Sequence, residues 1–408
     1  MIDELTGAFA DRFGVAPNRI FRSPGRVNLI GEHTDYSLLP VLPMAIDRAV
    51  YLAVGPGTDG RIVAESATEA EPFEAAVDGL GRSWEGWHRY LVAAIETIVP
   101  DRAGARLFID SDLPATGGLS SSSAFSVGVL AALDHVWRRG HQREDFIELA
   151  AGAERRIGVE SGAMDQTVIA LAQRNHALRI DFDPITVRHV PIPDDIRVVA
   201  AYSGSPAPKG GSAREQYNLR VVACRAAALL LGDLLGIEMR TPPVLRDVAE
   251  AAGEAVLGRL PAVATAVEVA NRLGVDPAVM TRLTNVSFDP MAPLPVEVVA
   301  RHVVSEAGRV DEAETALRTA DLTELGRLLD ASHLSLQEFG ASSPALDRLT
   351  AAMRDAGAAG ARITGAGFGG YAVAMCRPDK VEDLVEAALG ATGGPAFEVR
   401  PSDGVRAV

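Results

Sequence analysis

The sequence predicts an α+β protein of two domains. Strand-like and helix-like segments interleave without the regular strand–helix–strand rhythm of a doubly wound parallel sheet. The chain has 408 residues, which is about two or three times the length of a typical single domain. A turn-rich stretch at 204–212 precedes a mainly helical second half. We therefore place the boundary near residue 195, with one domain at 1–195 and the other at 196–408.

Hydrophobic periodicity assigns the individual elements. Apolar and polar residues alternate, as in β-strands, over four segments: Ile62–Glu65, Ala105–Ile109, Ile196–Tyr202 and Tyr371–Cys376. Apolar residues recur at helical spacing over five segments: Trp87–Ile98, Ser122–Trp137, Arg143–Ile157, Ala213–Leu235 and Val310–Leu317.

Charge and composition exclude several classes of function. The formal net charge is -15, which argues against nucleic acid or an anionic membrane surface as a partner, because both need clustered cations. Two cysteines, Cys224 and Cys376, are expected to be free buried thiols of a reducing compartment. No apolar run approaches the ~20 residues of a membrane span, and the N-terminus lacks a signal-peptide core. We expect a cytoplasmic monomer.

The segment Pro114–Ala124 (PATGGLSSSSA) follows a predicted strand and opens a predicted helix. Its glycines let a ligand approach the backbone, its hydroxyls can bond oxygens, and the helix N-terminus adds partial positive charge. This pattern indicates a polyphosphate seat. The alternative is a flexible loop with a serine N-cap. The usual nucleotide P-loop is excluded, because no Gly-Lys-Ser/Thr follows the glycines.

The segment Gly365–Gly370 (GAGFGG) has the glycine spacing of a dinucleotide fingerprint. That fingerprint needs a helix after the glycines, whereas the strand-like Tyr371–Cys376 follows here. We reject the dinucleotide interpretation and predict a tight glycine turn against a ligand or another backbone.

The segment Ser23–Tyr36 (SPGRVNLIGEHTDY) gathers Glu32, His33 and Asp35 within four residues. Such a cluster suits sugar recognition, because carboxylates accept charge-assisted hydrogen bonds from hydroxyl groups. A metal site or an exposed polar turn would give the same spacing.

Taken together, these segments resemble the three signature motifs of the GHMP kinases, and Gly25–Tyr36 resembles the signature of galactokinases in particular. Further stretches agree with galactokinase motifs in chain order: Trp87–Tyr90, Gly158–Gln166, Tyr217–Cys224 and Arg362–Gly370. The resemblance implies an α/β N-terminal domain related to a ribosomal-protein fold and a ferredoxin-like C-terminal domain. It also implies that ATP phosphorylates galactose to galactose 1-phosphate in the cleft between the two domains.

The resemblance assigns roles to residues that match the motifs. Asp165 would be the general base, and Arg26 would keep it ionised and stabilise the transition state; the alternative for Asp165 is a helix N-cap. Mg²⁺ would be held by Ser122 and Glu154, although Glu154 could instead be an exposed helix residue. The expected sugar ligands are Glu32, His33, Asp35, Gly162 and Tyr217. The expected ATP contacts are Gly117, Gly118, Leu119, Ser120, Ser121, Ser122 and Ser123, with Lys209 near the phosphates.

Some residues depart from the family pattern. Ser37–Pro40 lacks the usual asparagine and glycine beside the sugar site, which leaves N-acetylgalactosamine, arabinose or a glucuronic acid as alternative substrates. Thr116 and Ala366 replace glycines and Ser123 replaces an alanine; side chains there require a negative φ. A sensor that binds ATP and galactose without transfer is the alternative outside the enzymes. It is disfavoured, because the phosphate loop, Arg26 and Asp165 are intact.

Overall fold

A computed structural model describes residues 1–58, 60–81, 83–98, 103–114, 118–158, 162–206, 211–276 and 288–408, with the backbone alone at 211–214. The chain divides into two compact units that are discontinuous in sequence. Unit 1 comprises Met1–Val27, Met44–Ala177 and Arg400–Val408; unit 2 comprises Asn28–Pro43 and Leu178–Val399. The single boundary near residue 195 stays a prediction.

The described strands of unit 1 belong to a six-stranded sheet in the order β12-β1-β2-β5-β3-β4. Its strands are β1 (Arg19–Ile30), β2 (Leu42–Pro56), β3 (Arg61–Ser66), β4 (Phe73–Ala76), β5 (Ala105–Ser111) and β12 (Arg406–Ala407). The strand pair β3–β5 is parallel, whereas β2–β5 and β3–β4 are antiparallel.

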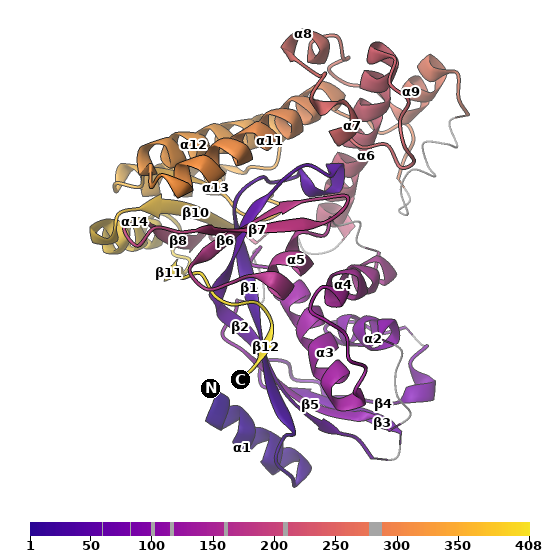
Figure 1. The fold of residues 1–408 in the computed structure, drawn as a ribbon, viewed down its shortest axis with the longest axis vertical. Coiled ribbons are helices and arrows are strands. Elements are labelled where there is room, and N and C mark those ends of the chain that lie inside the picture. Colours follow the sequence, from indigo (N-terminus) through magenta and orange to yellow (C-terminus); the bar gives the residue numbers. More distant parts are fainter. Residues whose placement is uncertain are drawn as a thin grey trace. The chain divides into compact units, whose positions relative to one another are not determined.

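Helices cover both faces of this sheet (Figure 1). The helices are α1 (Ile2–Phe13), α2 (His88–Thr97), α3 (Ser121–Trp137), α4 (Asp145–Arg156) and α5 (Met164–Leu171), with the 3₁₀ turn η2 (Val77–Gly79). Strand alternation places neighbouring residues of β2 on opposite faces. Ala53 packs with Phe9 of α1, whereas Leu52 lies against Gly128 of α3 on the other face.

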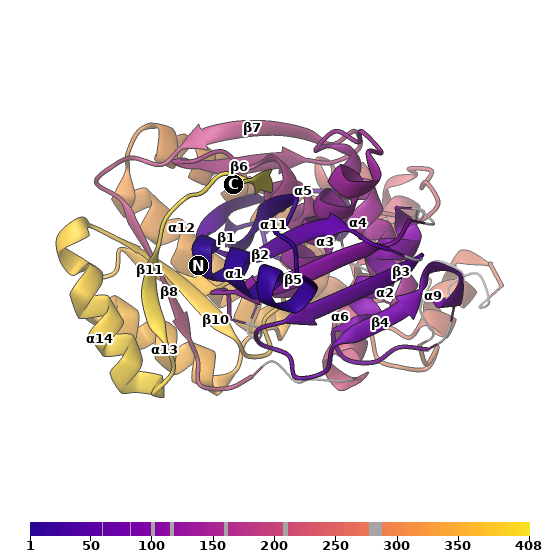
Figure 2. The same ribbon diagram turned by 90° about the horizontal axis from the view of Figure 1, so that it is seen from below.

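Unit 2 contains a four-stranded antiparallel sheet in the order β11-β8-β10-β9. Its strands are β8 (Arg197–Tyr202), β9 (Gly360–Ile363), β10 (Tyr371–Cys376) and β11 (Ala396–Val399). Helix α13 (Pro344–Asp355) precedes β9, and α14 (Val381–Thr392) joins β10 to β11. Figure 2 shows both helices beside this sheet. This strand order with these helices is the ferredoxin-like arrangement that was predicted.

The remaining elements of unit 2 are mostly helices: α6 (Gly211–Leu235), α7 (Arg246–Ala249), α8 (Glu254–Leu257), α9 (Ala266–Leu273), α11 (Val296–Arg318) and α12 (Leu322–Phe339). A hairpin of β6 (His176–Asp181) and β7 (Thr186–Pro191) and the turns η1 (Asp35–Ser37) and η3 (Pro378–Lys380) complete the list. Side-chain caps fix several helix starts: Asp321 accepts the backbone N–H of Glu324, and Ser343 accepts that of Leu346.

The predicted strands and helices are confirmed, with two instructive differences. The segment 23–30 has no strand assigned to it from the sequence, yet it belongs to the buried strand β1. Helical periodicity was recognised only over Val310–Leu317, whereas α11 begins at Val296. Its first turns bury His302 and Glu306 among valines, and these polar residues interrupt the apolar stripe that marks a helix.

Both cysteines are free and buried, as predicted. In the described part of the chain, no helix is long and apolar enough to cross a membrane.

Candidate active site

The serine-rich segment leads directly into the longest helix of unit 1. Gly118 and Ser120 both adopt positive φ, and α3 then runs from Ser121 to Trp137. The segment lies against β1: the backbone N–H of Arg26 donates to the Leu119 carbonyl at 3.1 Å. A Cβ on Gly25 would lie 2.8 Å from that carbonyl oxygen, so only glycine permits this approach. Gly117 lies outside the described residues.

Arg26 and Asp165 form the central ion pair of unit 1. Arg26 Nε and Nη2 donate to Asp165 Oδ1 and Oδ2 at 2.7 and 2.9 Å, which is the bidentate geometry of a strong guanidinium–carboxylate pair. The Arg26 side chain is 6% exposed and that of Asp165 is 23% exposed. The pair is therefore shielded on the arginine side and open on the carboxylate side.

The serine-rich segment closes around this pair. Ser120 Oγ donates to Asp165 Oδ2, and Arg26 Nη1 donates to the Gly118 carbonyl. Asp165 is the second residue of α5, and the cap position belongs to Ala163, so the N-cap alternative for Asp165 is wrong. The guanidinium, the carboxylate and the serine loop thus meet at one place in unit 1. Gly162, also in unit 1, is half-buried in the segment just before α5.

Glu154 approaches the same helix from α4. It is 6% exposed, so the alternative of an exposed helix residue is wrong. Ser123 Oγ donates to Glu154 Oε1 at 2.6 Å, whereas the preceding Ser122 is exposed. A buried carboxylate beside a serine hydroxyl is a donor set that suits Mg²⁺ shared with phosphate oxygens. The predicted pairing of Ser122 with Glu154 in metal binding stays a prediction.

The acid–His–acid cluster lies in unit 2 and is not a solvated turn. Glu32 is 3% and His33 5% exposed, and Asp35, which is half-buried, begins the short turn η1. Asp35 Oδ1 accepts the Tyr36 backbone N–H at 2.9 Å. No group of three His, Cys, Asp or Glu side chains in the described chain could hold a metal ion, so the metal-site alternative finds no support there.

His33 is held in one tautomer by its neighbours. Its Nε2 lies 3.1 Å from the Ala366 carbonyl oxygen and its Nδ1 lies 3.1 Å from the Tyr36 hydroxyl. Because a carbonyl can only accept, Nε2 carries the hydrogen and Nδ1 accepts from the tyrosine. Burial, followed by the neighbouring His302, lowers the pKa of His33 to about 3. His33 is therefore neutral, and both ring nitrogens already have protein partners.

Glu32 connects the acid–His–acid cluster to the predicted glycine turn. Its Oε1 accepts the Gly365 backbone N–H at 2.7 Å and lies 3.6 Å from Arg362 Nη2. With the His33–Ala366 contact, two hydrogen bonds join residues 32–33 to residues 365–366. Tyr217, half-buried on α6, places its ring 5.7 Å from that of His33.

The glycine turn itself matches its prediction. It lies between β9 and β10, so a strand follows the glycines and the dinucleotide interpretation is correctly rejected. Gly365, Gly367 and Gly370 have positive φ, and Ala366 is not among the described residues that do. The side chain of Ala366 is therefore tolerated, as is that of Ser123 within α3. Thr116 and Lys209 lie outside the described residues.

Reasoning from the sequence missed the buried polar partners of residues 31–32, namely His302, Glu306 and Arg362, and also Ser332, which donates to Glu306. One signal was available for the first two. They are four residues apart, on one face of a helix, within a segment whose other positions on that face are valine and alanine. Charged or imidazole groups on an apolar helix face indicate a buried polar network.

Comparisons with known proteins agree with the motifs. A galactokinase galactose-binding signature matches residues 7–56, and the GHMP kinase N-terminal and C-terminal domains match residues 89–173 and 313–394. A galactokinase of Roseiflexus sp. (strain RS-1) is 37% identical, covering 98% of this chain and 96% of the relative. A galactokinase of Chloroflexus aurantiacus is 36% identical, covering 95% and 91%.

Solved structures show the same fold. A Lactococcus lactis galactokinase complexed with galactose superposes with a TM-score of 0.79 at 27% identity, covering 99% of both chains. A Methanococcus jannaschii mevalonate kinase, at 16% identity, has a TM-score of 0.63 over 94% of this chain and 98% of the other. With identities above one third across almost the whole sequence, the chain belongs to the galactokinase family of the GHMP kinases.

Proposed function

We propose that this protein transfers the γ-phosphoryl group of ATP to galactose, forming galactose 1-phosphate and ADP and releasing the proton of the sugar hydroxyl. The observation that carries the proposal is the bidentate Arg26–Asp165 pair closed by Ser120 at the start of α3. It brings a carboxylate, a guanidinium and a helix N-terminus together, groups that can orient the attacking hydroxyl and stabilise the charge of a phosphoryl transfer.

Asp165 acts on the sugar. Its Oδ2 accepts one hydrogen bond from Arg26 and one from Ser120, whereas its Oδ1 accepts one from Arg26 and keeps a further lone pair. The exposed carboxylate edge can therefore accept the hydroxyl proton as the sugar oxygen forms its bond to phosphorus. Positioned acid–base help of this kind contributes roughly 10²–10⁴-fold to the rate. Arg26 fixes the carboxylate and adds positive charge where negative charge gathers.

The phosphates lie at the N-terminus of α3. Backbone N–H groups of the first helical turn have no partner within the helix and point toward an anion. The contacts come from Gly117, Gly118, Leu119 and Ser120–Ser123. Glu154, with a hydroxyl of Ser122 or Ser123, would hold Mg²⁺, which would neutralise charge on the triphosphate when bound.

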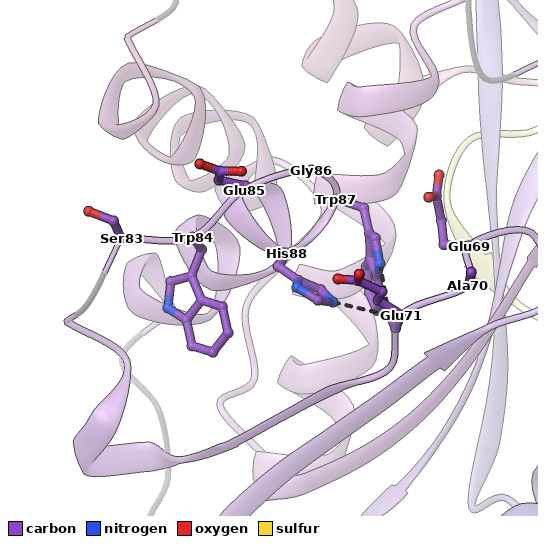
Figure 3. Close-up of a pocket in the computed structure, with 9 residues that line it drawn as sticks. All are labelled: Glu69, Ala70, Glu71, Ser83, Trp84, Glu85, Gly86, Trp87 and His88. Carbon is purple, nitrogen blue, oxygen red and sulfur yellow. Dashed lines mark hydrogen bonds between the residues drawn. The ribbon is translucent and has the colours of Figure 1, made fainter.

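A hollow beside α2 receives the nucleotide base. Its volume is about 530 Å³, and Trp84, Trp87 and His88 line it with residues 69–71, 83, 85 and 86. Figure 3 shows the Trp87 and His88 rings directed toward the Glu71 carbonyl, to which they donate at 3.2 and 3.1 Å. Trp87 also contacts Phe125 of α3 with ring centroids 6.1 Å apart. Aromatic walls near the phosphate seat suit a purine.

Galactose binds at residues 32–35 and Tyr217 of unit 2, and the predicted contact of Gly162, in unit 1, with the sugar stays a prediction. The buried Glu32 carboxylate and the half-buried Asp35 carboxylate are the acceptors of the sugar hydroxyls. We further propose that the chain acts as a monomer, so light scattering after size exclusion should give about 43 kDa, in line with the chain mass of 42.9 kDa. The meeting of sugar and ATP between the two domains stays a prediction.

A sugar panel tests this proposal. ADP release with ATP and Mg²⁺ should be at least tenfold faster, in kcat/KM, with galactose than with N-acetylgalactosamine, arabinose or glucuronic acid. ³¹P NMR should place the product phosphate on C1. Preference for another sugar would refute galactose as the substrate and trace to Ser37–Pro40. Saturable galactose binding without ADP release from any sugar would identify a sensor instead.

A further inference from the structure

The segment that carries Gly31 and Glu32 rests on a buried polar cluster that the catalytic scheme does not use. The cluster lies within unit 2. Its members are almost inaccessible to solvent: His302 is 1% exposed, and Ser332, Glu306 and Arg362 are 0% exposed. Burying charge costs free energy unless every charge is paired and hydrogen-bonded. The contacts that these buried groups make therefore indicate what the cluster does.

Helix α11 contacts the backbone of residues 31 and 32 at two points. Glu306 Oε1 accepts the Gly31 backbone N–H at 3.0 Å. One helical turn earlier, His302 Nε2 lies 3.0 Å from the Glu32 carbonyl oxygen, to which it donates, while its Nδ1 faces the Ser335 hydroxyl at 2.8 Å. Gly31 has φ 98 and its missing Cβ would meet Val41 backbone at 2.8 Å. The helix therefore clamps a turn that only glycine can form.

Glu306 collects two further donors. Ser332 Oγ donates to Oε1 at 2.6 Å, and Arg309 Nε donates to Oε2 at 2.6 Å. Burial by itself would raise the pKa of Glu306, but His302 and the guanidinium groups of Arg309 and Arg362 outweigh it and lower the pKa to about 2. Glu306 is thus a fully buried carboxylate that carries its negative charge at neutral pH.

Arg362 lies between two carboxylates. Its Nη2 is 3.6 Å from Glu32 Oε1 and 3.9 Å from Glu306 Oε1, and its Nη1 donates to the Asn28 carbonyl at 3.3 Å. Within the described chain, Nη2 makes ion pairs but no hydrogen bond. The guanidinium is therefore shared between Glu32, which is a sugar-binding candidate, and Glu306, which is not among the predicted sugar ligands.

We propose that Glu306 is a positioning residue for sugar recognition: it fixes the Gly31 turn and, by sharing Arg362, leaves the Glu32 carboxylate available to galactose. The proposal rests on the proposed function, in which residues 32–35 bind the sugar. Without the Glu306 charge, Arg362 would have Glu32 as its sole carboxylate partner in the cluster and would attract it more strongly. Galactose affinity would then fall, while the ATP contacts and Asp165, in unit 1, would not change.

The variant E306Q tests this. Glutamine keeps the carbonyl acceptor for Gly31 and the size of the side chain but removes the charge. We expect the galactose Kd by calorimetry without ATP, and the galactose KM, to rise about tenfold or more. The KM for ATP and kcat should stay within threefold. The matched control is E312Q, which removes a charge from the same helix at an exposed pair with Arg327, where the side chains are 56% and 58% exposed; it should change neither KM.

Four outcomes decide. A folded E306Q protein with unchanged galactose Kd and KM overturns the proposal, as does an equal rise in both KM values, which would indicate general loosening. If E306Q does not fold, S332A and Arg309→Gln act on the same carboxylate, and at least one must raise the galactose KM threefold or more without changing that for ATP. A wild-type protein that neither binds nor phosphorylates galactose defeats the proposed function itself, before any variant is compared.

Discussion

Two polar groups in this protein use their carboxylates in different ways. In unit 1, Asp165 pairs with Arg26 and keeps 23% of its side chain exposed, so its carboxylate can accept a proton from a ligand. In unit 2, Glu32 and His33 are 3% and 5% exposed. Glu32 accepts the Gly365 backbone N–H, and His33 contacts Ala366 and Tyr36. The first group can take part in the reaction, whereas the second fixes the shape of the segment that we propose binds the sugar through Glu32 and Asp35.

The difference shows that a motif residue can either contact the ligand or stabilise the turn on which the ligand-binding residues lie. Asp35 and Tyr217 are half-buried, which leaves room for sugar contact. His33, in contrast, has both nitrogens engaged by Tyr36 and Ala366. We therefore expect substitutions in unit 1 to reduce turnover, and substitutions of the buried residues in unit 2 to reduce sugar affinity or stability.

The largest expected effect is that of D165N. Asparagine retains the shape and can still accept from Ser120 but cannot take a proton, so kcat should fall by at least about 10²-fold and up to 10⁴-fold. The galactose Kd should remain within tenfold, because the sugar-binding carboxylates are untouched. Rapid-quench kinetics and calorimetry measure the two quantities. Near-native kcat in D165N would show that Asp165 is not the general base and that the unit 1 group does not differ from the unit 2 group in this way.

The second variant, R26K, separates charge from geometry. Lysine keeps the positive charge but cannot make the two parallel hydrogen bonds of Arg26 to Asp165 or reach Gly118 at the same time. We expect kcat to fall about 10²-fold with both KM values within fivefold. Steady-state kinetics measures this. A loss below threefold would show that charge alone suffices and that the bidentate geometry has no catalytic role.

The parts of this contrast that can be predicted from the sequence are those that depend on local patterns or on motifs. The two-domain α+β fold, the serine loop at a helix start and the Arg26–Asp165 pairing follow from periodicity and from the motif match. The burial of His33 against Ala366 and the contact of Glu306 with Gly31 could not be predicted. The partners lie 333 and 275 residues apart in sequence. No spacing rule connects such positions; only packing of α11 on the turn brings them together.

The third prediction uses pH to test whether His33 is structural. The folded pKa of about 3 lies below the ordinary value near 6.5. As pH falls below about 6.5, the unfolded histidine binds a proton that the folded one does not, so stability decreases toward low pH. His33 alone should contribute about 1.4 kcal/mol per pH unit in that range.

The variant H33Q should lack this contribution. Between pH 7 and pH 5, urea unfolding should show that its free energy of unfolding falls by roughly 2 kcal/mol less than that of the wild type. His302 and His333, with pKa values lowered to about 4, keep a similar slope in both proteins. An equal pH dependence in H33Q, together with a galactose Kd raised more than tenfold, would mean that His33 serves the sugar rather than the turn.

The smallest effect concerns the two serines that could accompany Glu154. If the exposed Ser122 holds Mg²⁺, S122A should raise the Mg²⁺ concentration for half-maximal rate about tenfold, or about 1.4 kcal/mol, and leave stability unchanged. S123A removes the hydroxyl that donates to buried Glu154, so it should cost about 1–3 kcal/mol of stability and shift the Mg²⁺ requirement less than threefold. Metal titration and urea unfolding of both variants separate the roles. The reverse pattern would assign the metal to Ser123. The ligand would then bind the more buried of two neighbouring hydroxyls, so exposure would not distinguish ligand-binding residues from structural ones.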